Sequence, residues 1–183
     1  MYTTERYEAT IPVKDYFARY VNIEEFVKRC RECSSYENTW SCPPFDFDVP
    51  EYWQSHELLE LTAIKIIFDD VYRGKTYSDD VIKEITDNSI FKEKQRLSEE
   101  LFAREKEHPG SVSLSAGSCS LCKGGCGRAV GRPCVFPEKM RYSIESLGGN
   151  VGLTISELMG IELEWMEENK LPAHFVLVCG LLI

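Results

Sequence analysis

The stretch Cys119-Ser-Leu-Cys122-Lys-Gly-Gly-Cys126-Gly-Arg-Ala-Val-Gly-Arg-Pro-Cys134 packs four thiols and four glycines into one short, irregular segment. Thiolates bind soft metals. A chain can wrap one metal centre only where its backbone turns sharply, and glycine permits such turns. We therefore interpret residues 117–137 as the main metal-binding loop, around which the rest of the chain is arranged.

The cysteine spacing in this loop is C-x2-C-x3-C-x7-C. Ferredoxin-type runs also bring three close cysteines and a more distant fourth, near a proline, to a cubane cluster, although their intervals differ from these. Four-cysteine zinc sites usually show two C-x2-C pairs, and only Cys119 and Cys122 form such a pair. The spacing favours a [4Fe-4S] cluster on Cys119, Cys122, Cys126 and Cys134, with zinc as the alternative.

Charge is unevenly distributed along the chain. Residues 119–141 hold five basic side chains against one acidic side chain, a local charge of +4 in a chain of net charge -9. A cluster held by four thiolates is anionic, so nearby cations would stabilise it and tune its potential. The alternative is that these are ordinary solvated side chains. The five basic residues are Lys123, Arg128, Arg132, Lys139 and Arg141.

Length and composition exclude several classes of protein and of partner. The 183 residues, 43% of them hydrophobic, are enough for one domain with its own core. The acidic balance argues against nucleic acid as a partner, because phosphate binding needs a large basic face. We expect no membrane segment and no export signal, hence a cytoplasmic protein. In that reducing compartment, metal explains eight cysteines better than disulfides do.

A second thiol group lies at residues 30–44, where Cys30, Cys33 and Cys42 form C-x2-C-x8-C-P-P-F. Three cysteines can leave one metal position open to water or substrate, or they can recruit a distant fourth ligand. His56 and Cys179 are the candidates for that ligand. His56 fits a helix surface better, and a lone cysteine in an apolar run is usually a small buried hydrophobe.

Periodicity and capping signals predict alternating helices and strands. We expect strands over 7–13, 61–68, 111–116 and 174–183. We expect helices over 23–30, from Pro50 to about Glu60, from Ser78 to His108, from Pro137 to Leu147 and from Thr154 to Met159. The predicted fold class is α/β or α+β, with a mixed sheet, flanking helices and the cysteine-rich loop region in one domain over 1–183.

With both cysteine groups in view, nearly the whole chain resembles a family of bacterial and archaeal proteins described only as predicted metal-binding, a cysteine-rich domain of unknown function. The resemblance rests on two signatures. One is Cys30-x2-Cys33 with Trp40-Ser-Cys42-Pro-Pro. The other is Cys119-x2-Cys122-x3-Cys126 followed by Pro133-Cys134-x2-Pro137-Glu-Lys-Met-Arg-Tyr-Ser-Ile-Glu-Ser-Leu-Gly-Gly-Asn-Val151.

The chain departs from that family at one point. The family usually reads Cys-Arg-His-Pro and later Pro-Ser-Met-Glu-Ala, whereas Val135-Phe136 and Tyr142-Ser-Ile-Glu-Ser146 stand here. The departure removes a histidine beside the metal and leaves every cysteine in place. The resemblance implies metal binding, of an iron-sulfur type typical of anaerobes, and implies no particular reaction.

Three functions stay open at this point. The leading hypothesis is an iron-sulfur protein for electron transfer or a redox accessory role, with one or two clusters and a redox partner protein or small molecule. The second is an enzyme with an open iron site on Cys30, Cys33 and Cys42. There, polar contacts would come from the run Arg141, Tyr142, Ser143 and Glu145, which more often simply supports a metal loop. The third is a zinc-stapled structural or interaction module.

Overall fold

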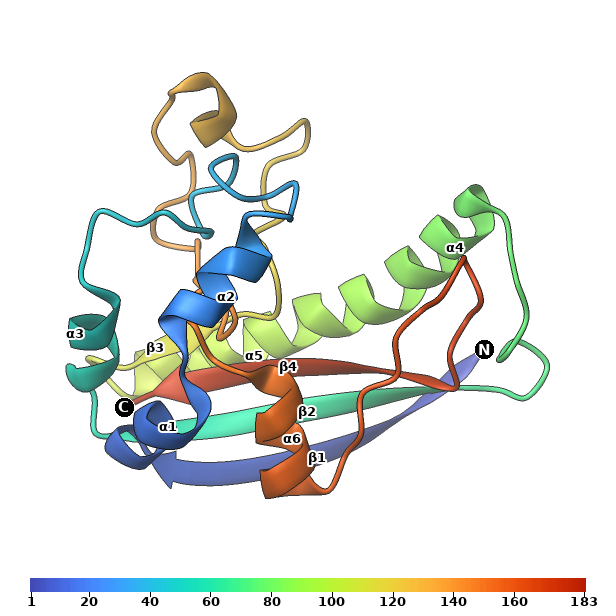
Figure 1. Cartoon of the computed structure of the whole chain (residues 1–183), viewed down its shortest axis with the longest axis horizontal. Coiled ribbons are helices and arrows are strands. Elements are labelled where there is room, and N and C mark those ends of the chain that lie inside the picture. The colour runs from blue at the N-terminus through green and yellow to red at the C-terminus, as the bar shows by residue number, and fades with distance from the viewer.

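The computed structural model describes residues 1–183 and is built on a four-stranded sheet in the order β1-β2-β4-β3 (Figure 1). All three strand pairings are antiparallel. The predicted combination of helices and a sheet is confirmed, but the sheet is not mixed. The single parallel pairing is an isolated bridge between Ser115 and Ser143. The strands are β1 (Tyr2–Pro12), β2 (Leu58–Phe68), β3 (Val112–Leu114) and β4 (His174–Leu182).

The two central strands are the most apolar ones, as a sheet covered on both faces requires. In β2, Leu59, Leu61 and Ala63 belong to one buried cluster, and the alternate residues Ile64, Ile66 and Phe68 belong to another. The same alternation in β4 separates Val178 from Cys179. Each of the four predicted strands is present, and β1 and β2 begin before the predicted boundaries.

Helices cover the two faces of the sheet. The first cluster is completed by α1 (Val13–Tyr20), α3 (Val49–Gln54) and α6 (Val151–Met159). The second is completed by α4 (Asp79–Thr86) and α5 (Lys92–Glu107), which lie on the other side of the sheet in Figure 1. A π-helical turn, η1 (Asp87–Phe91), joins α4 to α5, so that the predicted helix from Ser78 is continuous. No helix combines the length and the apolar character needed to cross a membrane.

The helix α2 (Ile23–Cys30) begins at Asn22, whose side chain accepts a hydrogen bond from the Glu25 amide at 3.1 Å. This is the predicted cap, and the helix ends at Cys30 as expected. Its flank meets the turn at Gly148 and Gly149. Gly148 has a φ of +88°, and a Cβ at Gly149 would lie 2.4 Å from Ile144 Cγ2. The Gly149 amide also donates to the Ile144 carbonyl and the Gly148 amide to the Glu145 carbonyl, so these glycines close a single turn in the manner of a glycine cap.

The helix predicted from Pro137 to Leu147 is wrong. Residues 137–149 form successive turns, although Ile144 and Leu147 are buried as the pattern indicated. Ser143 and Ser146 exchange hydrogen bonds between side-chain hydroxyl and backbone amide, at 3.0 and 3.1 Å. This reciprocal pair is the arrangement of a capping box, so a new turn begins at Ser143 and no helix from Pro137 continues through it. The other predicted helices exist, but α3 already ends at Gln54 and α6 begins at Val151.

Candidate metal centre

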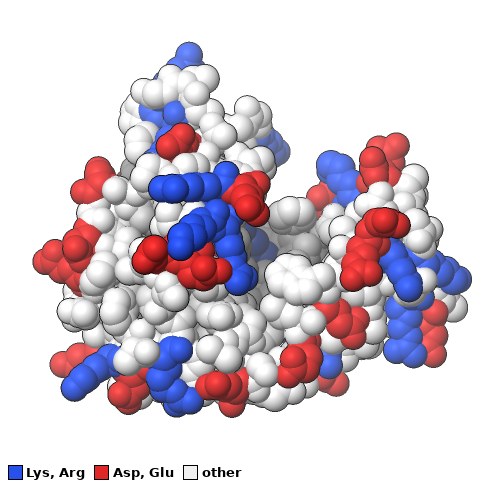
Figure 2. All heavy atoms as spheres, in the orientation of Figure 1, with Lys and Arg blue, Asp and Glu red and all other residues white.

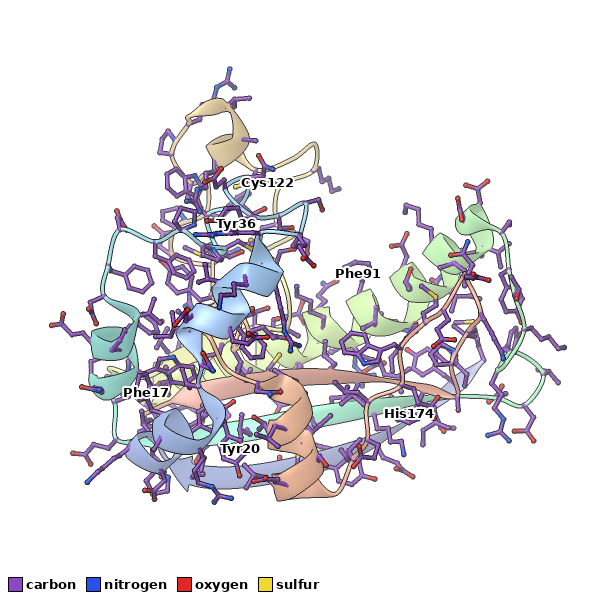
Figure 3. All side chains as sticks on the ribbon, in the orientation of Figure 1. Phe17, Tyr20, Tyr36, Phe91, Cys122 and His174 are labelled. Atoms are coloured by element: carbon purple, nitrogen blue, oxygen red, sulfur yellow. The ribbon has the colours of Figure 1, made fainter.

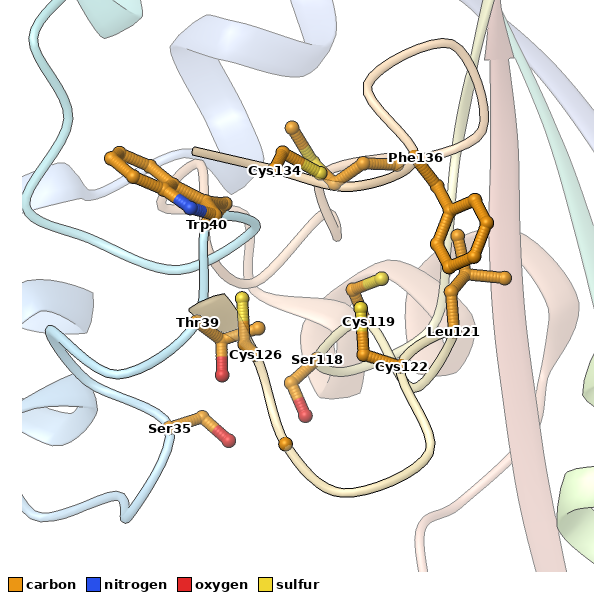
Figure 4. Close-up of a pocket in the computed structure, with 12 residues that line it drawn as sticks. Ser35, Thr39, Trp40, Ser118, Cys119, Leu121, Cys122, Cys126, Cys134 and Phe136 are labelled. Carbon is orange, nitrogen blue, oxygen red and sulfur yellow. The ribbon is translucent and has the colours of Figure 1, made fainter. Parts of the chain in front are cut away.

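The four cysteines of the main loop surround one pocket. Cys119, Cys122, Cys126 and Cys134 line a cavity of about 170 Å³. Figure 4 shows their sulfur atoms between Trp40 on one side and Phe136 on the other. All four residues are partly buried, and none forms a disulfide. The structure therefore brings together the whole thiol set that the spacing pointed to.

The thiols do not converge on a single point. No three donors among the His, Cys, Asp and Glu side chains are arranged to hold one metal ion. A tetrahedral zinc needs its sulfur ligands at about 2.3 Å from a common centre. The donor set is soft and the four thiols line one cavity, as suits a metal group held by thiolates.

The chain reaches this pocket through tight turns. The loop leaves the sheet after β3 and reverses at Gly124 and Gly125, both with a φ of +103°. Its only regular element is the 3-10 turn η2 (Gly127–Val130). Only glycine adopts such a φ without strain. The glycines thus serve the purpose expected from the sequence, which is to fold the thiols toward one another.

The second thiol group also assembles. Cys30 ends α2, and the Cys33 amide donates to the Cys30 carbonyl at 2.9 Å. Burial raises the pKa of the Cys42 thiol, and the nearby Cys33 and Cys30 raise it further. Each thiol lies near the other two, but no fourth cysteine joins them. Cys179 is fully buried in β4, where burial raises its pKa to about 12.

The histidines stand apart from both groups. His56 contacts Ser55 and the Tyr52 carbonyl. His174 lies at the sheet, with its Nε2 2.9 Å from the Glu162 carbonyl oxygen, well away from Cys122 in Figure 3. His108 ends α5 and is exposed. The sequence suggested His56 or Cys179 as a distant fourth ligand, and the structure brings neither to the three cysteines.

The two cysteine segments are fastened to each other, a point the sequence left open. The Cys119 amide donates to Ser41 Oγ at 2.8 Å. The Trp40 indole donates to the Arg132 carbonyl at 3.0 Å. The Arg128 guanidinium lies 5.1 Å from the centre of the Trp40 ring. We call residues 31–47 and 117–142 together the cysteine lobe; it forms the upper left of Figure 1.

Arg128 is the main cross-link within the lobe. Its guanidinium donates to the carbonyl oxygens of Thr39 at 3.0 Å, Cys42 at 2.5 Å and Pro44 at 2.6 Å. Arg141 instead pairs with Glu105 of α5 at 2.6 Å, and both side chains are largely buried. These two cations are therefore structural, rather than the solvated side chains of the alternative reading.

Lys94 is a partly buried cation that the sequence did not single out. Its amine donates to the Ser118 carbonyl at 2.7 Å. Burial lowers its pKa, and the neighbouring Cys179, Cys119, Glu145 and Cys42 oppose that effect. Both thiol groups are thus within its electrostatic reach. The signal was present: Lys94 shares the helical stripe of Ile90, Leu97 and Leu101, at spacings of four, three and seven residues.

Glu145 is the other unexpected group. Its Oε2 is buried and is the single buried side-chain polar atom without a hydrogen-bond partner. Burial raises the pKa of this carboxyl. The Glu145 charge also raises the pKa of Cys30, after burial and Cys33. A buried polar atom without a partner is costly and calls for an explanation, such as a bound ion.

Comparison with known proteins assigns a family. A family model described as "Predicted metal-binding protein (DUF2284)" matches residues 17–183. The match includes both thiol groups and all of the lobe. No similar protein was found among curated proteins or among solved structures.

Proposed function

Because the chain belongs to the DUF2284 family of predicted metal-binding proteins, we propose that the metal is a [4Fe-4S] cluster on Cys119, Cys122, Cys126 and Cys134. The observation that carries the proposal is the shared pocket, in which four thiols surround about 170 Å³ without converging on a single-ion point. A single zinc would require the loop to contract, whereas a cluster requires thiols at the corners of a larger object.

The composition of the lobe supports a metal group as its core. Among its residues only Thr39, Ser41 and Pro43 are buried. A segment with a single buried apolar side chain, that of Pro43, has little hydrophobic free energy of its own, and metal binding commonly supplies the missing part. The 3-10 turn η2 is also its only helix or strand.

The chemistry proposed for the site is electron transfer in a redox or accessory role. When bound, a cluster with four thiolate ligands supplies one-electron chemistry and no vacant iron position. The residues of the chain set its environment. Lys94 places a cation beside Cys119, and burial of the Cys119 thiol raises its pKa, opposed by the Leu121 amide and Lys94. Nearby cations and amide donors raise the potential of an anionic cluster.

We propose a redox partner protein at the tip of the lobe. Leu121, Val130, Val135 and Phe136 all lie on the lobe and are between 39% and 68% exposed. Exposed apolar side chains that gather at one site commonly mark an interaction surface. An acidic chain of net charge -9 is not suited to nucleic acid, and the proposed location is the cytoplasm.

The test is metal analysis of protein purified without oxygen. We expect about four iron and four acid-labile sulfide per chain, with visible absorption that bleaches on reduction by dithionite. Cys122→Ala should lose this iron, and Cys179→Ala, whose thiol lies outside the pocket, should keep it. One zinc per chain and no colour would remove the cluster proposal and leave a zinc-stapled module.

A second candidate function is an enzyme with an open metal position at Cys30, Cys33 and Cys42. Two observations favour it: the three thiols are close together without a fourth, and Glu145, whose buried Oε2 has no hydrogen-bond partner, lies near Cys30. About eight iron per chain would support a second cluster. An added thiol should then change the spectrum of the native protein but not that of Cys33→Ala. Unchanged spectra in both would exclude an open position.

A further inference from the structure

A groove runs beside the metal pocket, between the cysteine lobe and the helix α5. Its cavity volume is about 810 Å³, within the range of small-molecule sites. Figure 2 shows the hollow between the lobe and the α4 end of the molecule, with mainly uncharged atoms at its floor. Cys119 and Leu121 line both the groove and the metal pocket. A molecule in the groove would therefore lie against the metal site.

The walls of the groove are largely apolar. Leu101 and Phe102 of α5 line it, together with Leu114 of β3. Phe91 also lines it and is 48% exposed. This residue ends the π-helical turn η1, and in Figure 3 it stands clear of the helix on its upper side. Single π-helical turns inside α-helices are frequent at functional sites.

Three of the four cations of the groove form no ion pair. The side-chain amines of Lys123 and Lys139 make no ion pair or hydrogen bond, and that of Lys94 donates only to the Ser118 carbonyl. Of the acids of the groove, Asp87 pairs with Lys83, whereas Glu99 accepts only from the neutral Gln95 side chain and keeps its charge. Arg141 is neutralised by Glu105. The groove thus keeps three cations without an ion-pair partner against one such acid, Glu99, in a chain of net charge -9.

From these observations we propose that the groove binds a small organic anion, an aromatic or branched carboxylate, with its apolar body on Phe91 and Phe102 and its carboxylate toward Lys94, Lys123 and Lys139. Apolar walls with a few converging polar groups are the usual form of a small-molecule site. Hydrogen bonds from ammonium groups to a carboxylate are stronger than neutral ones. The site adds a ligand class to the proposed redox centre but does not depend on the identity of the metal.

The probes are phenylacetate and 3-phenylpropionate, with 2-phenylethanol as a neutral control of similar shape. Binding to the metal-loaded protein is measured by calorimetry, and iron is counted in the same sample. We expect the carboxylates to bind and the alcohol to bind at least about tenfold more weakly. Lys123→Gln/Lys139→Gln should weaken carboxylate binding by about tenfold or more, and Phe91→Ala should weaken both kinds of probe.

The matched control is Lys92→Gln/Lys106→Gln, which removes the same charge from α5 outside the groove and should leave binding unchanged. Equal binding of alcohol and carboxylate, equal losses in the two double variants, or no binding of any probe would each overturn the proposal. Binding in a sample without iron would support the groove and contradict the cluster. Four iron per chain with no binding of any probe would support the cluster and overturn the groove proposal.

Discussion

The sheet and the cysteine lobe are stabilised by opposite means. The sheet is held by two clusters of buried apolar side chains, 15 on one face and 11 on the other. The lobe, with its thiols, has no such cluster of its own. It adds only the partly buried Phe45, Phe47 and Tyr142 to the edge of the first cluster, and its other contacts are mainly hydrogen bonds to backbone carbonyls. The difference teaches that the frame can fold by hydrophobic burial, whereas the lobe needs its metal.

The largest effect should come from removing the metal. We expect a chelator under reducing conditions to make trypsin cleave at Lys123, Arg128 and Arg132 at least about tenfold faster, because the lobe has no other core. Sites on α5, such as Arg96, should stay protected. Digestion followed by mass spectrometry measures both rates. Equal acceleration at α5 would mean that the frame also depends on the metal.

The frame should respond to loss of a core side chain whether or not metal is present. Trp53 is fully buried, and its indole donates to the Leu147 carbonyl at 3.0 Å. Trp53→Ala should lower the free energy of unfolding by about 3–5 kcal/mol. Urea denaturation of the metal-free and loaded proteins measures the change. A loss confined to the loaded protein would contradict the division between frame and lobe.

The link between the two regions should be weakened by Glu105→Gln. The Glu105 carboxylate pairs with Arg141 of the lobe and accepts from the Ser113 amide at 2.6 Å. Breaking a largely buried pair by removing one partner costs about 3 kcal/mol. Exposed Glu107→Gln is the control. The expected result is a lower urea midpoint for Glu105→Gln alone.

Acid should weaken the same link. Burial acts to raise the pKa of Glu105, but the hydrogen bonds from Arg141 and Ser113 outweigh it, so the folded pKa is below the usual value. The contribution of the pair is therefore present above the unfolded pKa and is lost as the pH falls through the folded one. The native protein should lose more stability on acidification than Glu105→Gln does. Parallel plots of unfolding free energy against pH for the two proteins would refute this.

The smallest expected effect concerns Glu145, at the boundary between the regions. Burial raises its folded pKa, so its contribution to stability is present below the unfolded pKa and is lost as the pH rises through the folded one. In metal-free protein, Glu145→Gln should raise stability at neutral pH and flatten the dependence of stability on pH. Destabilisation by this change in the loaded protein alone would instead indicate a contact with the metal.

The same division explains what the sequence could predict. Continuous apolar runs and a capping residue are local signals, so β4, β2 and α2 were predicted near their true positions. The spacing of Met140, Ile144 and Leu147 is also helical, but Ser143 and Ser146 bond to local backbone amides and hold turns instead. The pattern indicated which side chains are buried, not the backbone that buries them.

For the candidate site, spacing predicted which cysteines would group, because a loop with glycines folds its own thiols together. Spacing carried no information on the contacts between the two segments, such as the Cys119 amide with Ser41. It also gave no reason to expect that Lys94, among the charged residues of its helix, would lie near the thiols. The unpartnered carboxyl of Glu145 follows only from three-dimensional packing.

The bridge between Ser115 and Ser143 has a consequence for the lifetime of the site. Ser115 donates its amide to the Tyr142 carbonyl at 2.8 Å, so the frame clamps both ends of the thiol loop. The entropy of closing that loop is thus lost when the frame folds, not when metal arrives. A chain that has lost its metal under reducing conditions would still hold both ends of the thiol loop together, so that reloading requires the lobe, but not the frame, to order again.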